Sequence, residues 1–430
     1  MTEPTIETAR VPDAEAAPGL TGIRLFVIVV LPFGCGYFMS YLFRTVNSVI
    51  APQLVRDVGL SAGDLGLLTA AYLFAFAVFQ IPNGILLDRF GPRRVQSALL
   101  LSAVLGAVIF SVSDSREMLM FGRALIGLGF AGGLMSGFKL ITMWYPKERW
   151  AVINGCYLFL GGLGAAASTA PVEVALQLTD WRGVFIGLAV LTLAASAAIF
   201  FIVPDKQGLA KPVPAREQLR GVAHVFTDRL FWAVSPHVVF TQAAGLAIQG
   251  LWAGPWLRDV AGLDRSQTAF YLLCLNLGLA GGFIALGWLS GLLAKRGVQL
   301  WQTAIGGTLL FFLVQLVVLA EVDVKGLWVW ILFGFACNST AMCYPYLAQH
   351  FPLEYVGRAN AALNFISFVG AFLIQYGIGF VIDLFAPAAP GQYKPVAYQA
   401  AFGIVLGIQV LCFVWYLYAV PRAQRAGSRN

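Results

Sequence analysis

The sequence predicts an all-α membrane protein whose twelve transmembrane helices form two six-helix bundles, and three observations support this prediction. Of the 430 residues, 59% are hydrophobic and only 11% are charged, whereas soluble proteins carry about 25% charged residues. Twelve apolar runs reach the roughly 20 residues that a membrane-spanning helix needs. One long polar stretch divides these runs into two sets of six.

The twelve apolar runs follow one another at short intervals. A helix of this length satisfies its backbone hydrogen bonds internally, as a lipid environment requires. The runs lie near residues 24–51, 65–87, 95–113, 118–144, 150–176, 182–203, 229–257, 267–293, 300–320, 326–349, 356–385 and 397–420.

Polar segments divide the chain into five parts. Residues 1–22 are polar and lack the basic start of a cleavable signal peptide, so we expect a disordered tail. Residues 23–203 form the N-terminal bundle and residues 229–420 the C-terminal bundle. The basic stretch 204–228 is the linker between them, and 421–430 form a second tail.

The basic residues show which ends of the helices face the cytoplasm. Of the 28 Lys and Arg residues, 18 fall in the tails, the linker and the connections on the same side, 7 on the opposite side and 3 within apolar runs. The positive-inside rule then places both tails in the cytoplasm. We expect a multi-pass protein of the plasma membrane, in bacteria the inner membrane. The basic residues of these tails and connections account for the net charge of +7. The charge therefore does not indicate a nucleic-acid partner.

The two halves carry a weak internal repeat. Tyr145-Pro-Lys-Glu148 with Asn154 recurs as Phe351-Pro-Leu-Glu354 with Asn360, at the same spacing. Parallel repeats of this kind place a substrate site near the midplane, between the halves.

A short charged segment separates the second and third runs. Asp88 stands where the apolar run ends, basic residues follow it, and Gly91-Pro92 break the helix. The segment resembles the loop signature of the major facilitator superfamily, Gly-x-Leu-x-Asp-Arg-x-Gly-x-Arg-Arg. The matching residues are Gly84, Leu86, Asp88, Arg89, Gly91, Arg93 and Arg94.

The resemblance covers the chain after residue 22 and implies the fold and cycle of that family, alternating access between the two bundles. It also implies that the loop residues form a conformational latch with the facing bundle on the cytoplasmic side. Arg123, followed by Gly127 and Gly129, resembles the family's fourth-helix motif, whose arginine is structural or coupling-related. The latch set is therefore Gly84, Asp88, Arg89, Gly91, Arg93 and Arg123.

The first helix resembles the anion:cation symporter branch of the family through Arg44, Asn47 and Pro52. In that branch the arginine contacts an anionic substrate. Many members also carry acids at two positions that read Phe43 and Phe130 in this chain. Coupling through a carboxylate is therefore not implied, and the coupling ion is left open.

Cations within the membrane mark functional sites, because burying them is costly. Tyr37, Tyr41 and Arg44 share one helical face, which we expect to line the cavity. The alternative is a structural arginine paired with backbone. Lys139 either joins Arg44 in a two-cation site or extends its amine to the interface; both interpretations stand.

Side chains with amide and indole groups predict the wall of the cavity that faces Arg44. The seventh helix carries Gln242, Gln249 and Trp252 on one side, and later helices add single amides. Hydrogen bonding between helices is the alternative for each amide alone. The predicted substrate-binding residues are Tyr37, Tyr41, Arg44, Lys139, Gln242, Gln249, Trp252, Asn276, Asn338 and Asn364.

These features predict a secondary or facilitative transporter of a small organic anion, either a carboxylate or an acidic sugar, and not an enzyme. The chain has no Gly-x-x-x-x-Gly-Lys-Ser/Thr loop for ATP-driven transport, and its six scattered cysteines indicate neither a metal site nor a disulfide framework. No cofactor is expected, and the partners are the substrate, the bilayer and no second subunit. An exporter of amphipathic compounds, suggested by 13% aromatic residues, is one alternative. A membrane receptor or scaffold is the other, disfavoured by the short loops.

Overall fold

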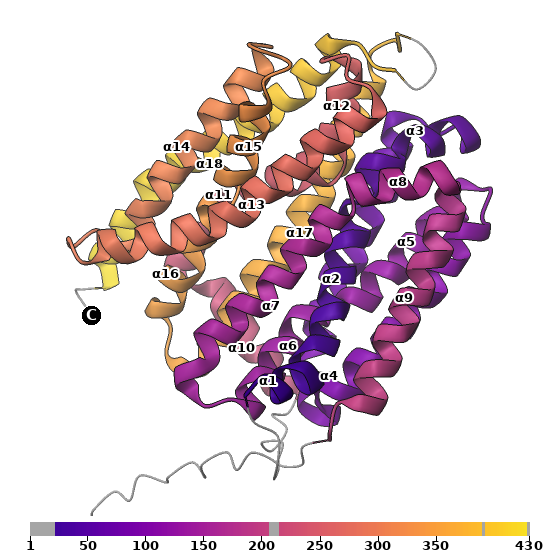
Figure 1. The fold of residues 1–430 in the computed structure, drawn as a ribbon. Coiled ribbons are helices and arrows are strands. Elements are labelled where there is room, and N and C mark those ends of the chain that lie inside the picture. Colours follow the sequence, from indigo (N-terminus) through magenta and orange to yellow (C-terminus); the bar gives the residue numbers. More distant parts are fainter. Residues whose placement is uncertain (1–21, 206–214, 389–391, 428–430) are drawn as a thin grey trace, which may run out of the picture.

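The computed structural model describes residues 22–205, 215–388 and 392–427. The tail predicted for residues 1–22, except Gly22, lies outside the described residues, as does part of the linker. Within the described part the chain is helical almost throughout (Figure 1).

The first half runs from α1 to α9 and the second from α11 to α18, with α10 between them. The first half comprises α1 (Gly22–Leu25), η1 (Phe26–Val30), α2 (Leu31–Thr45), α3 (Asn47–Val58), α4 (Ala62–Val112), α5 (Arg116–Phe130), α6 (Gly133–Trp144), α7 (Lys147–Ala167), α8 (Ala170–Leu178) and α9 (Trp181–Ile202). The remainder comprises α10 (Ala215–Thr227), α11 (Arg229–Ala247), η2 (Ile248–Trp252), α12 (Ala253–Asp259), α13 (Arg265–Ala294), α14 (Leu300–Leu319), α15 (Leu327–Ala336), η3 (Ser339–Met342), α16 (Cys343–His350), α17 (Leu353–Asp383) and α18 (Pro395–Gly427).

Twelve helical spans in the described residues are long and apolar enough to cross a membrane, which confirms the predicted number. Several spans join successive elements, such as α11, η2 and α12. The element α4 contains two spans and folds back at Gly91, whose φ of 77° and ψ of 161° are non-helical. A residue with a side chain rarely adopts such a positive φ, which explains glycine there.

Side-chain caps fix where the helices begin. Ser61 accepts from the backbone N–H of Asp64 at the start of α4, and the Asp64 side chain accepts from the Ser61 N–H. Asp264 and Gln267 form the same capping box at α13. Each box satisfies two donors that the first helical turn leaves free.

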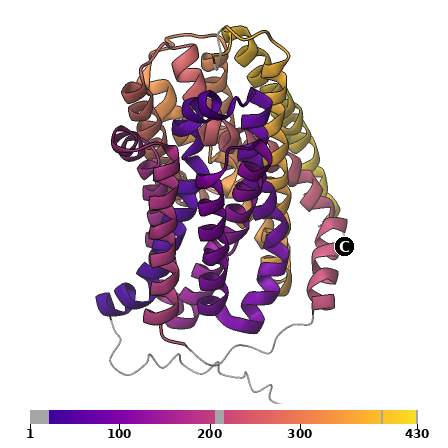
Figure 2. The same ribbon diagram turned by 90° about the vertical axis from the view of Figure 1, so that its right-hand side faces the viewer.

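The two halves lie side by side, with α4 of the first against α17 of the second (Figures 1 and 2). Glycines allow this close approach. A Cβ on Gly379 would lie 2.4 Å from the carbonyl oxygen of Ala62, and one on Gly254 would lie 2.2 Å from that of Ser48. Small residues at helix crossings are the usual means of packing helices in lipid.

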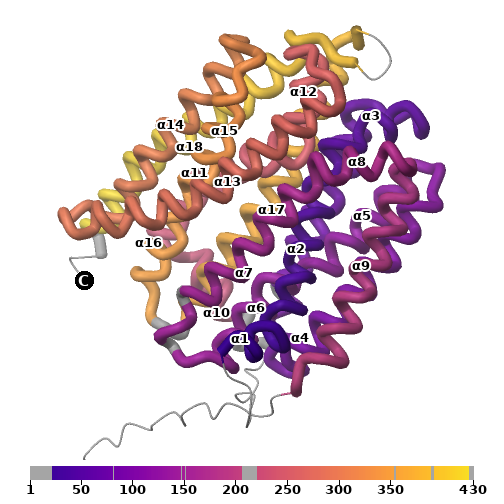
Figure 3. Tube along the Cα trace, viewed as in Figure 1, coloured from indigo at the N-terminus to yellow at the C-terminus, as the bar shows by residue number. Residues whose placement is uncertain are grey.

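The structure has two distinct ends. Figure 3 shows α1, α6 and α10 gathered near one end, together with the fold in α4, and α3, α8 and α12 near the other. We call the first, which holds Asp88–Arg94, the motif end, and the second, which holds the last residue of α17, the Asp383 end. The predicted linker is partly helical, since α10 packs against α17, and α18 extends through most of the predicted tail 421–430.

Candidate substrate cavity

A cavity of about 320 Å³ lies between the two halves and is lined from both. The volume is at the lower end of the range of about 300–1,000 Å³ typical of small-ligand sites. Seven of the ten predicted substrate-binding residues line it: Tyr37, Tyr41, Arg44, Gln242, Gln249, Asn338 and Asn364.

Arg44 is the cation of the cavity. Its side chain is only 9% exposed and its Nε has no hydrogen-bond partner. The guanidinium carbon lies 4.6 Å from the ring centre of Tyr41, 5.1 Å from that of Phe76 and 5.2 Å from that of Phe368. Phe368 belongs to the second half, so Arg44 stands where the halves meet.

The charge of Arg44 is incompletely compensated. Taking an ion out of water costs several kcal/mol, and each aromatic ring returns about 0.5–2 kcal/mol. Within the described residues Arg44 forms no ion pair with a carboxylate, and none of the cavity-lining side chains there is acidic. An anion in the cavity would complete the compensation.

Tyrosines form the wall beside Arg44, as their spacing in the first helix predicted. The Tyr37 hydroxyl donates to that of Tyr41 at 3.5 Å, and its ring stacks on Tyr157 with centres 4.8 Å apart. Tyr157 is itself anchored, because its hydroxyl donates to the Gly133 carbonyl oxygen at 2.7 Å.

Oriented amides form the facing wall. Tyr344 donates to the Gln242 amide oxygen at 3.1 Å, and Gln249 Nε2 donates to Asn276 Oδ1 at 2.6 Å. Asn276 is buried behind the wall and does not line the cavity. Sequence reasoning placed it in contact with substrate, whereas the structure gives it the task of orienting Gln249.

Trp252 also lies outside the cavity lining. Its indole N–H donates to the Gln375 carbonyl oxygen at 3.2 Å, and the side chain is fully buried. Its partner lies on α17, and its ring approaches Gly66 of α4, so the indole packs where the halves are in contact.

Lys139 is not brought to Arg44. Its Nζ donates to Asp88 Oδ1 at 2.6 Å and to the Leu87 carbonyl oxygen at 2.8 Å. The predicted two-cation site is therefore absent from the described cavity lining, because the positive charge of Lys139 is already balanced by Asp88 at the motif end. Nothing in the sequence pairs these two residues, which are 51 positions apart.

In this conformation two arginines of the loop signature bind residues of their own half. Arg93 Nε donates to the Phe200 carbonyl oxygen at 2.9 Å, and Arg94 pairs with Asp205 at 3.0 Å. Arg89 lies over the ring of Phe90. Gly84 precedes Asp88 by about one turn of α4. The latch role of the segment therefore stays a prediction about another conformation.

Arg123 lies away from the cavity, in the packed interior of the first half. It is 1% exposed, donates from Nη1 to the Phe43 carbonyl oxygen at 2.7 Å, and lies over the rings of Phe110 and Phe185. These partners all belong to one half, which fits the structural role implied by the family resemblance.

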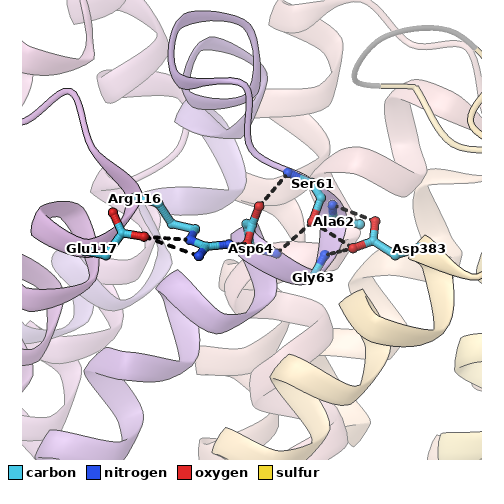
Figure 4. Close-up of polar contacts among 7 residues, drawn as sticks. All are labelled: Ser61, Ala62, Gly63, Asp64, Arg116, Glu117 and Asp383. Atoms are coloured by element: carbon cyan, nitrogen blue, oxygen red, sulfur yellow. Dashed lines mark hydrogen bonds and ion pairs between the residues drawn. The ribbon is translucent and has the colours of Figure 1, made fainter.

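Two carboxylates, those of Asp383 and Glu173, join the halves at the Asp383 end. No partner was predicted from the sequence for either of them. Asp383 accepts from Ser61 Oγ at 2.7 Å, from the Ala62 N–H at 2.9 Å and from the Gly63 N–H at 2.7 Å (Figure 4). Glu173 of the first half pairs with Arg265 of the second at 3.3 Å. The three hydrogen bonds to Asp383 hold the Asp383 end closed. Their only sequence signal is an acid at the end of an apolar run.

His237 is a packing residue. Its Nδ1 is 3.3 Å from Thr241 Oγ1 and its Nε2 is 3.2 Å from Thr308 Oγ1, and the side chain is fully buried. All six cysteines are free thiols, and the described residues contain no cluster of potential metal ligands.

The fold and the cavity define a class of protein, a multi-pass integral membrane protein with a central cavity between two six-helix halves. Residues 33–375 match the model of the Major Facilitator Superfamily. The chain belongs to that family, as its loop signature predicted.

Relatives of the chain are transport proteins rather than enzymes. It is 29% identical over 275 residues to the probable sulfoacetate transporter SauU of Cupriavidus necator, covering 60% of this chain and 64% of that protein. It is 26% identical over 246 residues to the nitrite extrusion protein of Bacillus subtilis, covering 56% of this chain and 60% of that protein. The matched region is thus less than two thirds of either relative's length.

A solved structure confirms the fold. A bacterial homologue of the human lysosomal transporter Spinster, in an inward-facing and unoccupied conformation, matches with a TM-score of 0.78 at 18% identity. The match covers 94% of this chain and 99% of that one.

Proposed function

We propose that the chain moves a small organic anion, a carboxylate or acidic sugar, across the membrane by alternating access. One observation carries this proposal: Arg44 is a buried cation without a carboxylate partner among the described residues, and it lines a cavity between the two halves. A guanidinium presents paired donors that match a carboxylate. The names of the two relatives, for sulfoacetate and nitrite, support an anionic substrate.

The amide wall suits the neutral part of such a substrate. Gln242, Gln249, Asn338 and Asn364 offer both donors and acceptors to hydroxyl groups. We assign anion binding to Arg44, assisted by Tyr37 and Tyr41, and recognition of the polar body to the amides. Lys139, Asn276 and Trp252 are left out because they do not line the cavity.

Binding of anions to the purified protein tests the proposal. A ligand at 100 times its Kd stabilises the native state by about 2.7 kcal/mol, which raises the melting temperature. We expect carboxylates and sugar acids to raise it, and Arg44→Ala to weaken binding by roughly ten- to a hundredfold, because a hydrogen bond to a charged group contributes about 1.5–3 kcal/mol.

Lys139→Gln is the matched control, because it removes a cation of the same half that does not line the cavity. This variant should keep the anion-induced shift. A shift that survives in Arg44→Ala and disappears in Lys139→Gln would contradict the proposal.

An exporter of amphipathic compounds is the second candidate, and one observation favours it. An apolar pocket of about 720 Å³ lies between α7 and α13 and shares Tyr41, Leu158, Leu279 and Phe283 with the central cavity. Stabilisation of wild type and Arg44→Ala alike by cationic or neutral amphiphiles, with no effect of anions, would favour this second function.

A further inference from the structure

The central cavity holds one positive charge that the protein does not balance. Lys139, the other basic residue near this part of the first half, is neutralised by Asp88. Arg123 is enclosed entirely by its own half. Arg44 alone among these three cations lines the cavity and contacts both halves, through Phe76 on one side and Phe368 on the other.

The surroundings of Arg44 must change during an alternating-access cycle. Phe76 and Phe368 have ring centres 4.4 Å apart and join the halves beside the guanidinium. An opening of the Asp383 end that moves α4 away from α17 would separate this pair. Between the two open conformations the cavity closes at both ends, and water that solvates Arg44 must be expelled or trapped. The surroundings of Arg123 do not change in this way, because its partners move with it.

The electrostatic free energy of the closed intermediate therefore depends on whether a substrate is bound. When empty, it encloses an uncompensated guanidinium in a medium of low dielectric constant, which is unfavourable. With one singly charged anion on Arg44, the net charge of the cavity is zero. A carboxylate in the cavity could neutralise Arg44 in the empty protein, but the described lining residues include none.

We propose that the chain is an obligate exchanger of singly charged anions, which passes through its closed intermediate readily only when an anion is paired with Arg44. This inference rests on the proposed function and specifies its mode of transport. An anion carried in one direction must then be replaced by one carried in the other. A doubly charged anion would leave one negative charge in the closed cavity and is exchanged more slowly.

The test uses the purified 430-residue chain in liposomes, with potassium and valinomycin clamping the membrane potential so that charge movement does not limit uptake. The probes are the singly charged galactonate, glucuronate and nitrate and the doubly charged sulfoacetate, all radiolabelled or assayed chemically. Uptake is compared between vesicles preloaded with the same anion and vesicles loaded with potassium sulfate and buffer alone, because sulfate is doubly charged and is not a preferred exchange partner under the proposal. Binding of each probe is measured in parallel by thermal shift.

We expect a singly charged probe that binds to enter preloaded vesicles on the order of ten times faster than vesicles without it, a ratio that corresponds to a barrier difference of roughly 1.4 kcal/mol. Equal rates in the two kinds of vesicle would overturn the exchange proposal while leaving anion transport intact. Faster exchange of sulfoacetate than of every singly charged probe would overturn the charge assignment. Absence of both binding and uptake for all probes would overturn the proposed function, and exchange with it.

A substitution that supplies the missing carboxylate gives an independent readout. Phe76 lines the cavity, and its ring centre is 5.1 Å from the Arg44 guanidinium carbon. In Phe76→Glu the empty protein carries its own counter-charge, so we expect the ratio of exchange to net uptake to fall toward one. If this variant does not fold, the wild-type comparison still decides the proposal; if it folds and the ratio is unchanged, the electrostatic reason given for exchange is wrong.

Discussion

At the scale of single residues, the role of a charged side chain in this protein depends on whether its contacts lie in its own half or in the other half. Arg93 and Arg123 bind carbonyl oxygens of their own half, whereas Arg44 and Glu173 stand where the halves meet. Contacts of the first kind persist through a conformational change, and contacts of the second kind are broken or remade. Substitutions at Arg44 and Glu173 should therefore affect the conformational equilibrium.

Glu173 gives a prediction about pH. Its side chain is 10% exposed, and this burial raises its pKa above the ordinary value of 4.5, although Arg265 opposes the shift. Because the closed conformation holds the proton more tightly than an open or unfolded chain does, the contribution of Glu173 to stability is greatest below pH 4.5 and declines as the pH rises through the raised pKa. Among the described residues that line the same small pocket, Arg258 is the charged neighbour besides Arg265.

A comparison of wild type with Glu173→Gln tests whether the contribution of Glu173 to stability declines as the pH rises. In thermal unfolding between pH 4 and pH 7, we expect the melting temperature of wild type to fall relative to that of Glu173→Gln as the pH rises. A wild type that gains stability over Glu173→Gln in the same interval would show that the ion pair with Arg265 outweighs the cost of burial.

At the scale of secondary structure, α4 and α17 form the most extensive packing contact between the halves. The first turn of α4 has free N–H groups and a positive dipole end, and the carboxylate of Asp383, at the last residue of α17, accepts from two of those groups and from Ser61. The last residue of a helix in the second half thus caps the N-terminus of a helix in the first half. The cap can form only when the Asp383 end is closed.

Removing this charge should open the Asp383 end. Hydrogen bonds to a charged group contribute about 1.5–3 kcal/mol, so Asp383→Asn should shift the equilibrium toward the open conformation by roughly ten- to a hundredfold. Spin labels at the exposed residues Arg56 and Val322, one in each half at this end, would report the shift as a longer distance.

Asp264→Asn is the matched control for the cap. Asp264 also caps a helix with its carboxylate, but it does so for α13, within the second half. This variant should destabilise α13 locally without lengthening the distance between the labels. An equal lengthening in both variants would mean that the effect of Asp383 is general destabilisation and not release of a contact between the halves.

At the scale of the whole molecule, both ends of the described chain lie toward the motif end. There α1 begins and α18 finishes, whereas α17 ends and α18 begins at the opposite end (Figure 1). With the concentration of Lys and Arg at the motif end, the positive-inside rule predicts that this end faces the cytoplasm. The Asp383 end would then face outward.

Reporter fusions test this orientation. Green fluorescent protein fused after residue 430 should fluoresce, and alkaline phosphatase at the same place should be inactive, because the first folds in the cytoplasm and the second outside it. The same reporters inserted between α17 and α18 should give the reverse result. Active phosphatase at the C-terminus would mean that the chain is inserted the other way.

The sequence by itself determined the class of fold, because a span in lipid must be apolar and about 20 residues long, and this constraint is local. It also determined the break at Gly91 and the family, through a motif of closely spaced residues. Tyr37, Tyr41 and Arg44 were found for the same reason, since their shared face follows from helical spacing alone.

Only the tertiary structure decided which residues meet. Lys139 and Asp88 are 51 residues apart, and Asp383 and Ser61 are 322 apart, so no local pattern relates them. Asn276 carries the same amide group as the lining residues Asn338 and Asn364, yet packing between helices keeps Asn276 and Trp252 out of the cavity lining. A charge or amide in a membrane helix must find a partner, but the sequence leaves open whether that partner is another side chain or the substrate, because neighbours across helices are set by the fold.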